Sequence, residues 1–196
     1  MRILNVGCGT ETFGTDFVDI RPSRPEVIKC DVSKHKLPYK NGTFDKVYSK
    51  NLLEHSANIF FTLNEMFRVL KKKGKIFILT DNAAWIMFHL PIRKNNYLQH
   101  YSNEVRDGNL DRHYFLFTPL HLKNLLEKVG FIEINTRYAY VSRNPRFKYF
   151  KPFINFLNKT SFKNLINPHI IVEATKWGKW YISEIYVELN VIKMEW

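Results

Sequence analysis

A short apolar run that leads into a glycine-containing turn constrains the fold of this chain more than any other feature. Residues 3–6 are apolar apart from one Asn, and Gly7 and Gly9 follow directly. Glycine lets the backbone approach a bound molecule closely and take conformations that a Cβ penalises. The next apolar run ends at Asp19, and nucleoside-binding α/β sheets place there a carboxylate that accepts hydrogen bonds from ribose hydroxyls. The dinucleotide fingerprint requires a third glycine where this chain has Thr12, so the glycine pair alone is a weak indication.

Strand and helix patterns alternate along the chain and predict a doubly wound α/β sheet. Short apolar runs predict strands at residues 3–6, 16–20, 27–30, 44–49, 75–80, 131–141 and 170–175. Helical spacing predicts a helix at 59–72, with lysines in its last turn and Gly74 ending it. It also predicts a short helix at 84–90, and a helix that begins at Thr118-Pro119 and stops at Gly130. The first crossover, 7–15, is shorter than the roughly 10–12 residues of a usual one, so its helix should be a single turn or absent.

Composition favours one domain over residues 1–196, because 45% of the residues are hydrophobic and the length suits a single core. No apolar run approaches the roughly 20 residues of a membrane span, and we expect no targeting segment. The two cysteines, Cys8 and Cys30, predict no disulfide, which favours a cytoplasmic protein. The net charge of +12 suits an anionic partner, whether nucleic acid, a membrane surface or an acidic small molecule. A solvated lysine-rich surface explains the charge equally well.

Two segments interrupt the regular pattern. Residues 82–117 are polar and aromatic beyond the short helix, and an insertion of this length predicts a lid. Residues 142–168 form a second lid-like insertion, which is basic and rich in Phe. They fit a helix packed on the core with a solvated basic face, a stacking site for single-stranded RNA, or an amphipathic helix on a membrane. After Trp177, residues 182–192 alternate apolar and polar as an edge strand does.

Four stretches in a fixed order resemble a known family: LNVGCGT, FVDI, CDVSKHKLPYKNGTFDKVYSKNLLEH and LNEMFRVLKKKGKIFILT. In them the chain resembles class I S-adenosylmethionine (SAM)-dependent methyltransferases of the broad type 11 kind, in a subgroup with a short glycine loop. The resemblance covers residues 2–81 closely and 116–131 more loosely. It implies a Rossmann-like seven-stranded sheet of order 3-2-1-4-5-7-6 with strand 7 antiparallel. It also implies an enzyme that uses SAM and releases S-adenosylhomocysteine.

The resemblance further implies which residues hold the cofactor. They are Asn5, Gly7, Cys8, Gly9, Asp19, Ile20, Asp31, Val32, Ser49, Lys50 and Asn51. Within this set, the glycine turn faces the methionine part of SAM, Asp19 holds the ribose hydroxyls, and Asp31 binds the adenine amine. Ile20 and Val32 lie against the adenine, and the three residues after the fourth strand line the pocket.

Two histidines are candidate catalytic residues. His55 ends an L-E-H stretch that matches a family signature, and His113 follows Asp111-Arg112 just before a helix. A histidine suits a base for an oxygen or ring-nitrogen acceptor, although each could instead shape the pocket. No metal is expected. We expect a small molecule or sugar as the acceptor; an RNA methyltransferase and a non-catalytic SAM- or nucleic-acid-binding protein are the alternatives.

Overall fold

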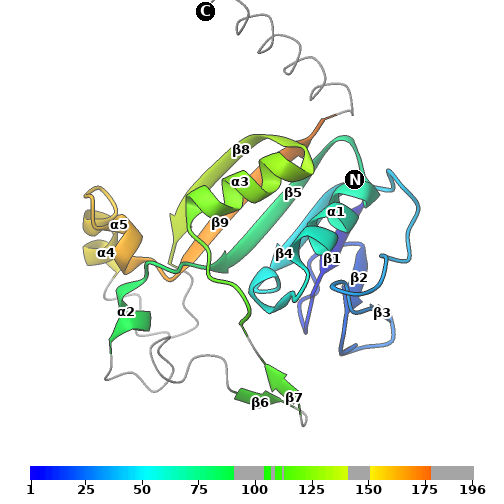
Figure 1. Ribbon diagram of the computed structural model, residues 1–196, viewed down its shortest axis with the longest axis horizontal. Helices are drawn as coiled ribbons and strands as arrows, with labels where there is room; N and C mark the ends of the chain where they lie inside the picture. Colours follow the sequence, from blue (N-terminus) through cyan, green and yellow to red (C-terminus); the bar gives the residue numbers. More distant parts are fainter. Residues whose placement is uncertain (91–103, 107–108, 112, 141–150, 178–196) are drawn as a thin grey trace, which may run out of the picture.

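The computed structural model describes residues 1–90, 104–106, 109–111, 113–140 and 151–177. A seven-stranded mixed sheet of order β3-β2-β1-β4-β5-β9-β8 crosses the molecule (Figure 1). Its strands are β1 (Ile3–Val6), β2 (Asp16–Asp19), β3 (Val27–Lys29), β4 (Phe44–Lys50), β5 (Leu70–Asp81), β8 (Phe131–Ala139) and β9 (His169–Lys176). Strand β9 is antiparallel to both β5 and β8, and the other pairs are parallel. The predicted order, with strand 7 antiparallel, is confirmed.

Two helices, α1 (Ile59–Val69) and α3 (Pro119–Val129), cover one face of the sheet (Figure 1). The side chain of Thr118 accepts a hydrogen bond from the His121 N–H at the start of α3 (3.3 Å), and Pro119 occupies its first turn. Gly130 ends the helix with φ +108°, in the left-handed region. Both predicted ends of α3 are therefore confirmed.

Besides the sheet and its two covering helices, the structure contains several short elements. They are the 3₁₀ turn η1 (Leu53–His55), α2 (Ile86–His89), the antiparallel pair β6 (Glu104–Arg106) and β7 (Asn109–Asp111), α4 (Lys151–Leu157) and α5 (Lys163–Ile166). Neither α4 nor α5 contains a fully buried residue, and both contain half-buried ones, so the three alternatives for residues 142–168 remain open. The predicted edge strand at 182–192 and residues 142–150 lie outside the described residues. No helix in the described ranges is long and apolar enough to cross a bilayer.

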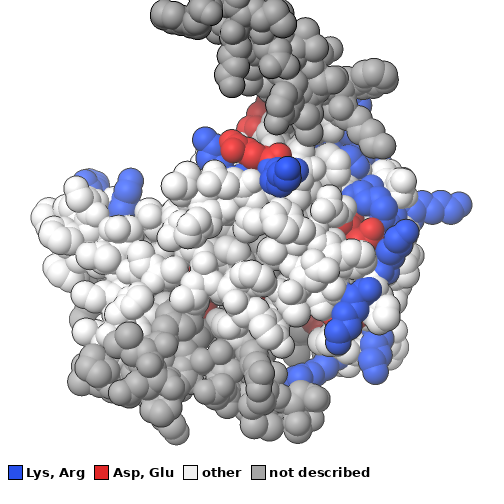
Figure 2. Space-filling model, viewed as in Figure 1, with Lys and Arg blue, Asp and Glu red and all other residues white. Residues whose placement is uncertain are grey.

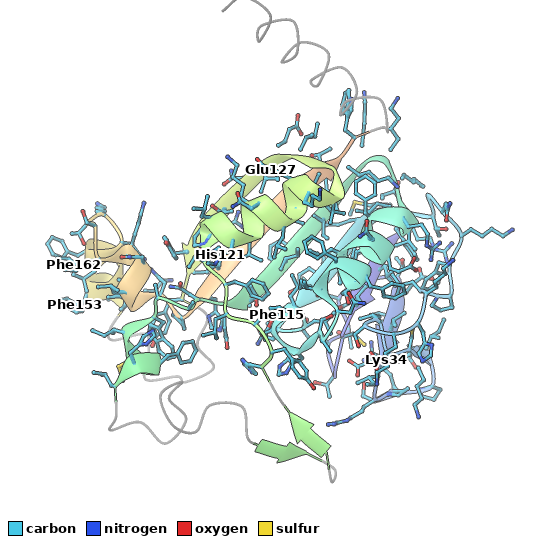
Figure 3. All side chains as sticks on the ribbon, viewed as in Figure 1. Lys34, Phe115, His121, Glu127, Phe153 and Phe162 are labelled. Carbon is cyan, nitrogen blue, oxygen red and sulfur yellow. The ribbon has the colours of Figure 1, made fainter. Side chains whose placement is uncertain are left out.

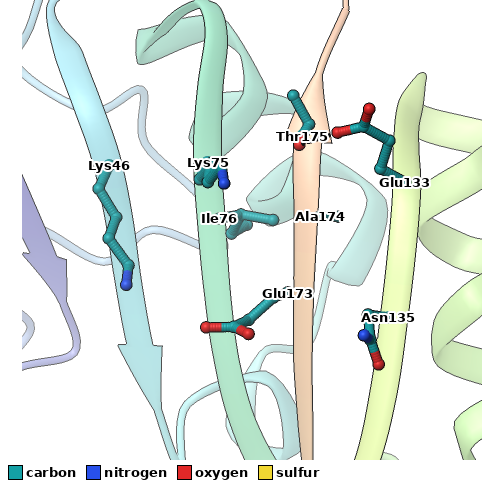
Figure 4. Close-up of a pocket in the computed structure, with 8 residues that line it drawn as sticks. All are labelled: Lys46, Lys75, Ile76, Glu133, Asn135, Glu173, Ala174 and Thr175. Carbon is teal, nitrogen blue, oxygen red and sulfur yellow. Dashed lines mark hydrogen bonds between the residues drawn. The ribbon is translucent and has the colours of Figure 1, made fainter.

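The crossovers at 7–15 and 20–26 contain no helix, and the length of the first predicts this. The second face of the sheet is consequently lined by half-buried side chains of the strands themselves. The ring of Tyr48 stacks on Phe77 (centroids 4.9 Å apart) and meets the edge of Phe13 (5.0 Å). A pocket of about 230 Å³ lies on this face, between Lys46, Lys75 and the strands β8 and β9 (Figure 4).

The prediction of a helix over 59–72 is wrong at its end. Helix α1 stops at Val69, and its last carbonyls accept hydrogen bonds from the N–H groups of Gly42 and Thr43 (3.0 and 2.8 Å). The lysines that follow belong to β5, where Lys73 has φ +64°. Gly74 lies inside that strand, where an added Cβ would come 2.8 Å from the carbonyl oxygen of Lys71. Glycine is therefore required at this strand position because any larger residue would clash with the backbone of Lys71.

Candidate active site

The turn after β1 places two glycines, which have no side chain, at the carboxyl edge of the sheet. Gly7 and Gly9 have φ +70° and +52°, in the region that favours glycine. A Cβ on Gly7 would lie 2.9 Å from Cδ1 of Leu52, whereas a Cβ on Gly9 would meet no atom within 4 Å. The turn is therefore packed on one side at Gly7 and open at Gly9.

Asp19 ends β2 and holds this turn in place. Its Oδ2 accepts a hydrogen bond from the Gly9 N–H, and its Oδ1 accepts one from the Arg21 N–H (both 2.8 Å). A carboxylate has about four lone-pair sites, so both oxygens keep capacity for ribose hydroxyls. The neighbouring Ile20 side chain is 52% exposed. An acidic group and an open apolar side chain thus lie next to each other at the sheet edge.

Two predicted cofactor residues support the turn through their side chains. The Asn5 amide donates to the carbonyl of Phe13 (3.0 Å), and Oδ1 of Asn5 is buried without a partner among the described residues. The Cys8 thiol is buried, and burial and the charge of Asp19 raise its pKa. A thiol with a raised pKa stays protonated at neutral pH, so Cys8 serves as a small packing residue.

Asp31 follows β3 beside the end of β2. Its Oδ1 accepts hydrogen bonds from the N–H and hydroxyl of Ser33 (3.0 and 2.6 Å), and Lys34 Nζ lies 3.2 Å from Oδ2. Desolvation raises the Asp31 pKa, but the Ser33 hydrogen bonds and Lys34 outweigh it and leave the pKa below its usual value. The ionised carboxylate can accept from an amine. The side chain of Val32 is packed in the core, so only its backbone can reach a ligand.

At the end of β4, Ser49 is buried, whereas Lys50 and Asn51 bond to neighbouring segments. Ser49 is fully buried, and its hydroxyl has no partner among the described residues, so its side chain lines the core instead of an open pocket. Lys50 forms an ion pair with Glu11 of the glycine loop. Asn51 has φ +49°, and its N–H donates to the carbonyl of Leu79 (2.8 Å). The Lys50–Glu11 pair therefore ties β4 to the glycine loop.

A second cluster lies further along the same edge of the sheet. Asp81 ends β5 and pairs in register with His169, the first residue of β9. Nδ1 of His113 is 3.6 Å from Oδ2 of Asp81, and Nε2 of His169 is 3.9 Å from Oδ1. The three side chains are only 13–15% exposed. One carboxylate is thus shared by two largely enclosed imidazoles.

The two histidines predicted from the sequence meet in this cluster. The rings of His55 and His113 contact edge to face, with centroids 4.4 Å apart. The contact depends on η1, because the Tyr114 N–H donates to the carbonyl of Glu54 (2.7 Å). The buried Glu54 carboxylate in turn accepts a hydrogen bond from the Thr80 hydroxyl (2.6 Å). Strand β5 and the segment before α3 therefore fix the two rings together.

His169 is held neutral by its surroundings. Burial lowers its pKa; the charge of Asp81 raises it in part, and the charge of Lys50 lowers it further. The lowered pKa leaves the imidazole of His169 uncharged at neutral pH. The charge of Lys50 lowers the pKa of His169, and the same side chain forms an ion pair with Glu11. Lys50 therefore links the histidine cluster electrostatically to the glycine loop.

Comparison with known proteins decides the family. A family described as a methyltransferase domain matches residues 1–134, about two thirds of the chain. The chain belongs to the class I SAM-dependent methyltransferases. An uncharacterized protein of Methanocaldococcus jannaschii, MJ0638, is 36% identical over 92 residues, which are 41% of this chain and 40% of that protein. The match therefore spans less than half of the length of the M. jannaschii protein.

Solved structures show the same fold. A SAM-dependent methyltransferase from Archaeoglobus fulgidus superposes with a TM-score of 0.59 over 89% of this chain and 86% of that one, at 19% identity. Phosphoethanolamine N-methyltransferase 2 of Haemonchus contortus, in complex with phosphomonomethylethanolamine and S-adenosylhomocysteine, superposes with a TM-score of 0.57. That match covers 91% of this methyltransferase and 49% of the other chain, at 19% identity.

The residues of this methyltransferase fit SAM. The open backbone at Gly9 leaves room that a Cβ would fill, and the Asp19 carboxylate faces it. The exposed Ile20 directly follows β2, and the ionised Asp31 follows the end of β3. This donor set suits a ribose diol flanked by an adenine ring.

Sequence reasoning missed three residues of this candidate site: Glu11, Asp81 and His169. Asp81 had a usable indication, because it directly follows a predicted strand and ligands bind beyond the carboxyl ends of parallel strands. Glu11 and His169 carry no local pattern, since their partners Lys50 and Asp81 are distant in the chain.

Proposed function

We propose that this methyltransferase transfers the methyl group of SAM to a nitrogen or oxygen atom of a small-molecule acceptor, an amine or a sugar hydroxyl. The cluster of Asp81, His113, His55 and His169, at the same edge of the sheet as the glycine turn, carries the proposal. Because the side chains of Asp81, His113 and His169 are only 13–15% exposed, a small acceptor can approach them more readily than a large one. The Haemonchus contortus relative is named for a small amine acceptor, which makes amines the first compounds to test.

SAM supplies an electrophilic methyl group on a sulfonium. In the reaction a carbon–sulfur bond breaks, a bond from carbon to the acceptor forms, and the acceptor loses a proton. We assign that proton to His113, because a carboxylate near Nδ1 stabilises the imidazolium that forms. His55 fixes the His113 ring by its edge contact, and Asp81 is a positioning residue. Holding the reactants at attack distance accounts for the rest of the acceleration.

The insertion 82–117 is proposed to cover the acceptor. Its two ends are joined, because the Ala83 N–H donates to the carbonyl of Phe117 (2.8 Å). Both ends therefore lie next to Asp81, where a cover over the cluster has to begin and end.

Calorimetric titration with SAM and S-adenosylhomocysteine tests the cofactor site. We expect binding by the wild type and a loss of about 100-fold or more in Asp19→Ala, because two hydrogen bonds to a charged group are removed. Asp45→Ala is the matched control, since Asp45 lies at the start of β4 and bonds Lys71 and the Arg2 N–H. Unchanged affinity in Asp19→Ala would refute this placement.

Release of S-adenosylhomocysteine with a panel of amines and sugars tests the transfer. We expect His113→Asn to lower kcat at least about 100-fold while SAM affinity is kept. Methyl label that enters RNA and no small molecule would replace the proposal with an RNA methyltransferase. SAM binding without any transfer would indicate a non-catalytic binding protein.

A further inference from the structure

The end of the molecule formed by α4 and α5 exposes aromatic side chains that methyl transfer does not use. Phe153, Phe156 and Phe162 are 59%, 64% and 59% exposed. Phe153 and Phe156 are three residues apart and share one side of α4. Ile154 and Leu157, on the other side, are half-buried. Figure 3 places Phe153 and Phe162 on the outer side, away from the sheet.

The same region is basic without any acidic residue. Residues 134–172 contain seven Lys and Arg residues and no Asp or Glu. Lys151, Lys159 and Lys163 are exposed among the three Phe residues. In Figure 2, basic side chains lie at this end with no acidic side chain beside them on the face shown. Exposed rings flanked by cations are the composition of a surface that meets apolar and anionic groups together.

This end is fixed to the site. The side chain of Asn82 is fully buried and donates to the carbonyls of Asn164 and Asn167 (2.6 and 2.7 Å). Asn82 directly follows Asp81 of the histidine cluster. Anything that binds α4 and α5 is therefore held next to the acceptor end of the sheet.

We propose that the α4–α5 end docks on an anionic lipid surface. The three Phe rings enter the boundary between headgroups and acyl chains, and the three lysines pair with lipid phosphates while their stems lie along the apolar layer. Single-stranded RNA is the weaker fit, because bases stack on rings beside a groove that tracks the backbone, whereas Phe153 and Phe162 project away from the sheet. The inference is independent of which acceptor is methylated.

Vesicle flotation tests the docking with the intact protein. The vesicles contain phosphatidylcholine alone or with about one third phosphatidylglycerol. We expect binding to the anionic vesicles, weakened at high salt, and little binding to neutral ones. A Phe153→Ser/Phe162→Ser variant should lose about tenfold in partitioning, and a Lys151→Gln/Lys159→Gln/Lys163→Gln variant about tenfold or more.

Two matched control variants remove the same number of lysines or of large apolar side chains at exposed positions away from α4 and α5. The charge control is Lys40→Gln/Lys72→Gln/Lys128→Gln, and the apolar control is Phe60→Ser/Leu120→Ser; all five positions are exposed. Circular dichroism and SAM affinity establish that each variant is folded. Absent binding to anionic vesicles, or equal losses in the controls, would overturn the proposal. An equal preference for single-stranded RNA that the Phe variant removes would replace the lipid surface with RNA.

Discussion

At the residue scale, the carboxylate of Asp81 organises the histidine cluster at the carboxyl edge of the sheet. One of its oxygens faces His113 and the other faces His169. The two histidines arrive from different directions, one from the segment before α3 and the other from the first residue of β9. The charge of the shared carboxylate offsets part of the cost that burial places on a charged His169, but not all of it. The same arrangement makes the stability of the fold depend on pH.

We predict that the neutral state of His169 makes the free energy of unfolding fall in acid. Burial holds the folded pKa below the usual 6.5, against the opposing charge of Asp81 and with the help of Lys50. As pH falls below about 6.5, the unfolded chain takes up this proton before the folded chain does. Stability is therefore lost from about pH 6.5 down to the lowered pKa of the folded state. Tm measured between about pH 7 and pH 5 should decline more steeply in the wild type than in His169→Gln. His113 and Asp81 remain in both proteins, so parallel curves would contradict the prediction.

At the element scale, local chemistry predicted most boundaries and failed at one junction. The start and end of α3 followed from Thr118, Pro119 and Gly130, which act through their own neighbours. The end of α1 did not, because Leu70 fits the apolar stripe of a helix and also pairs with Phe44 as a strand residue. A periodic pattern alone cannot separate these two uses of one buried leucine.

In the candidate site, too, some features could be predicted from the sequence and others could not. The glycine turn and Asp19 were predictable, because they are neighbours in sequence as well as in space. The grouping of His55 with His113 depends on a hydrogen bond between Tyr114 and Glu54, which no local pattern encodes.

Asn82 connects elements that the sequence treats as separate. Its amide donates to two carbonyls near α5, and its Oδ1 accepts from the Ala84 N–H (3.1 Å). We predict that Asn82→Ala lowers the free energy of unfolding by about 2–4 kcal/mol, since two buried carbonyls lose their donor. Urea denaturation measures the loss. Asn82→Asp keeps the acceptor for the Ala84 N–H but cannot donate and turns a carboxylate oxygen toward the two carbonyls, so it should be destabilised at least as much as Ala. A mild effect of Ala would show that water reaches these carbonyls.

At the scale of the whole molecule, the two faces of the sheet are unequal. Helices α1 and α3 cover one face and bury a continuous core that includes Leu63, Met66 and Leu122 (Figure 1). The other face has no helix among the described residues, because the crossovers before β2 and β3 are too short to hold one. A row of rings, Tyr48 among them, lies there in place of a helix.

This asymmetry predicts different costs for two Phe truncations. Phe44 is fully buried on the helix-covered side and contacts the ring of Tyr39 (4.8 Å), so Phe44→Ala should cost about 3–5 kcal/mol. Phe77 is half-buried on the second face, stacked on Tyr48 with Lys46 Nζ 5.3 Å from its centroid. Phe77→Ala should cost only about 1–2 kcal/mol, because much of its surface already meets water. Urea denaturation of the two variants gives both values. Equal losses would mean that the second face is covered in solution, and the inequality of the faces would then be disproved.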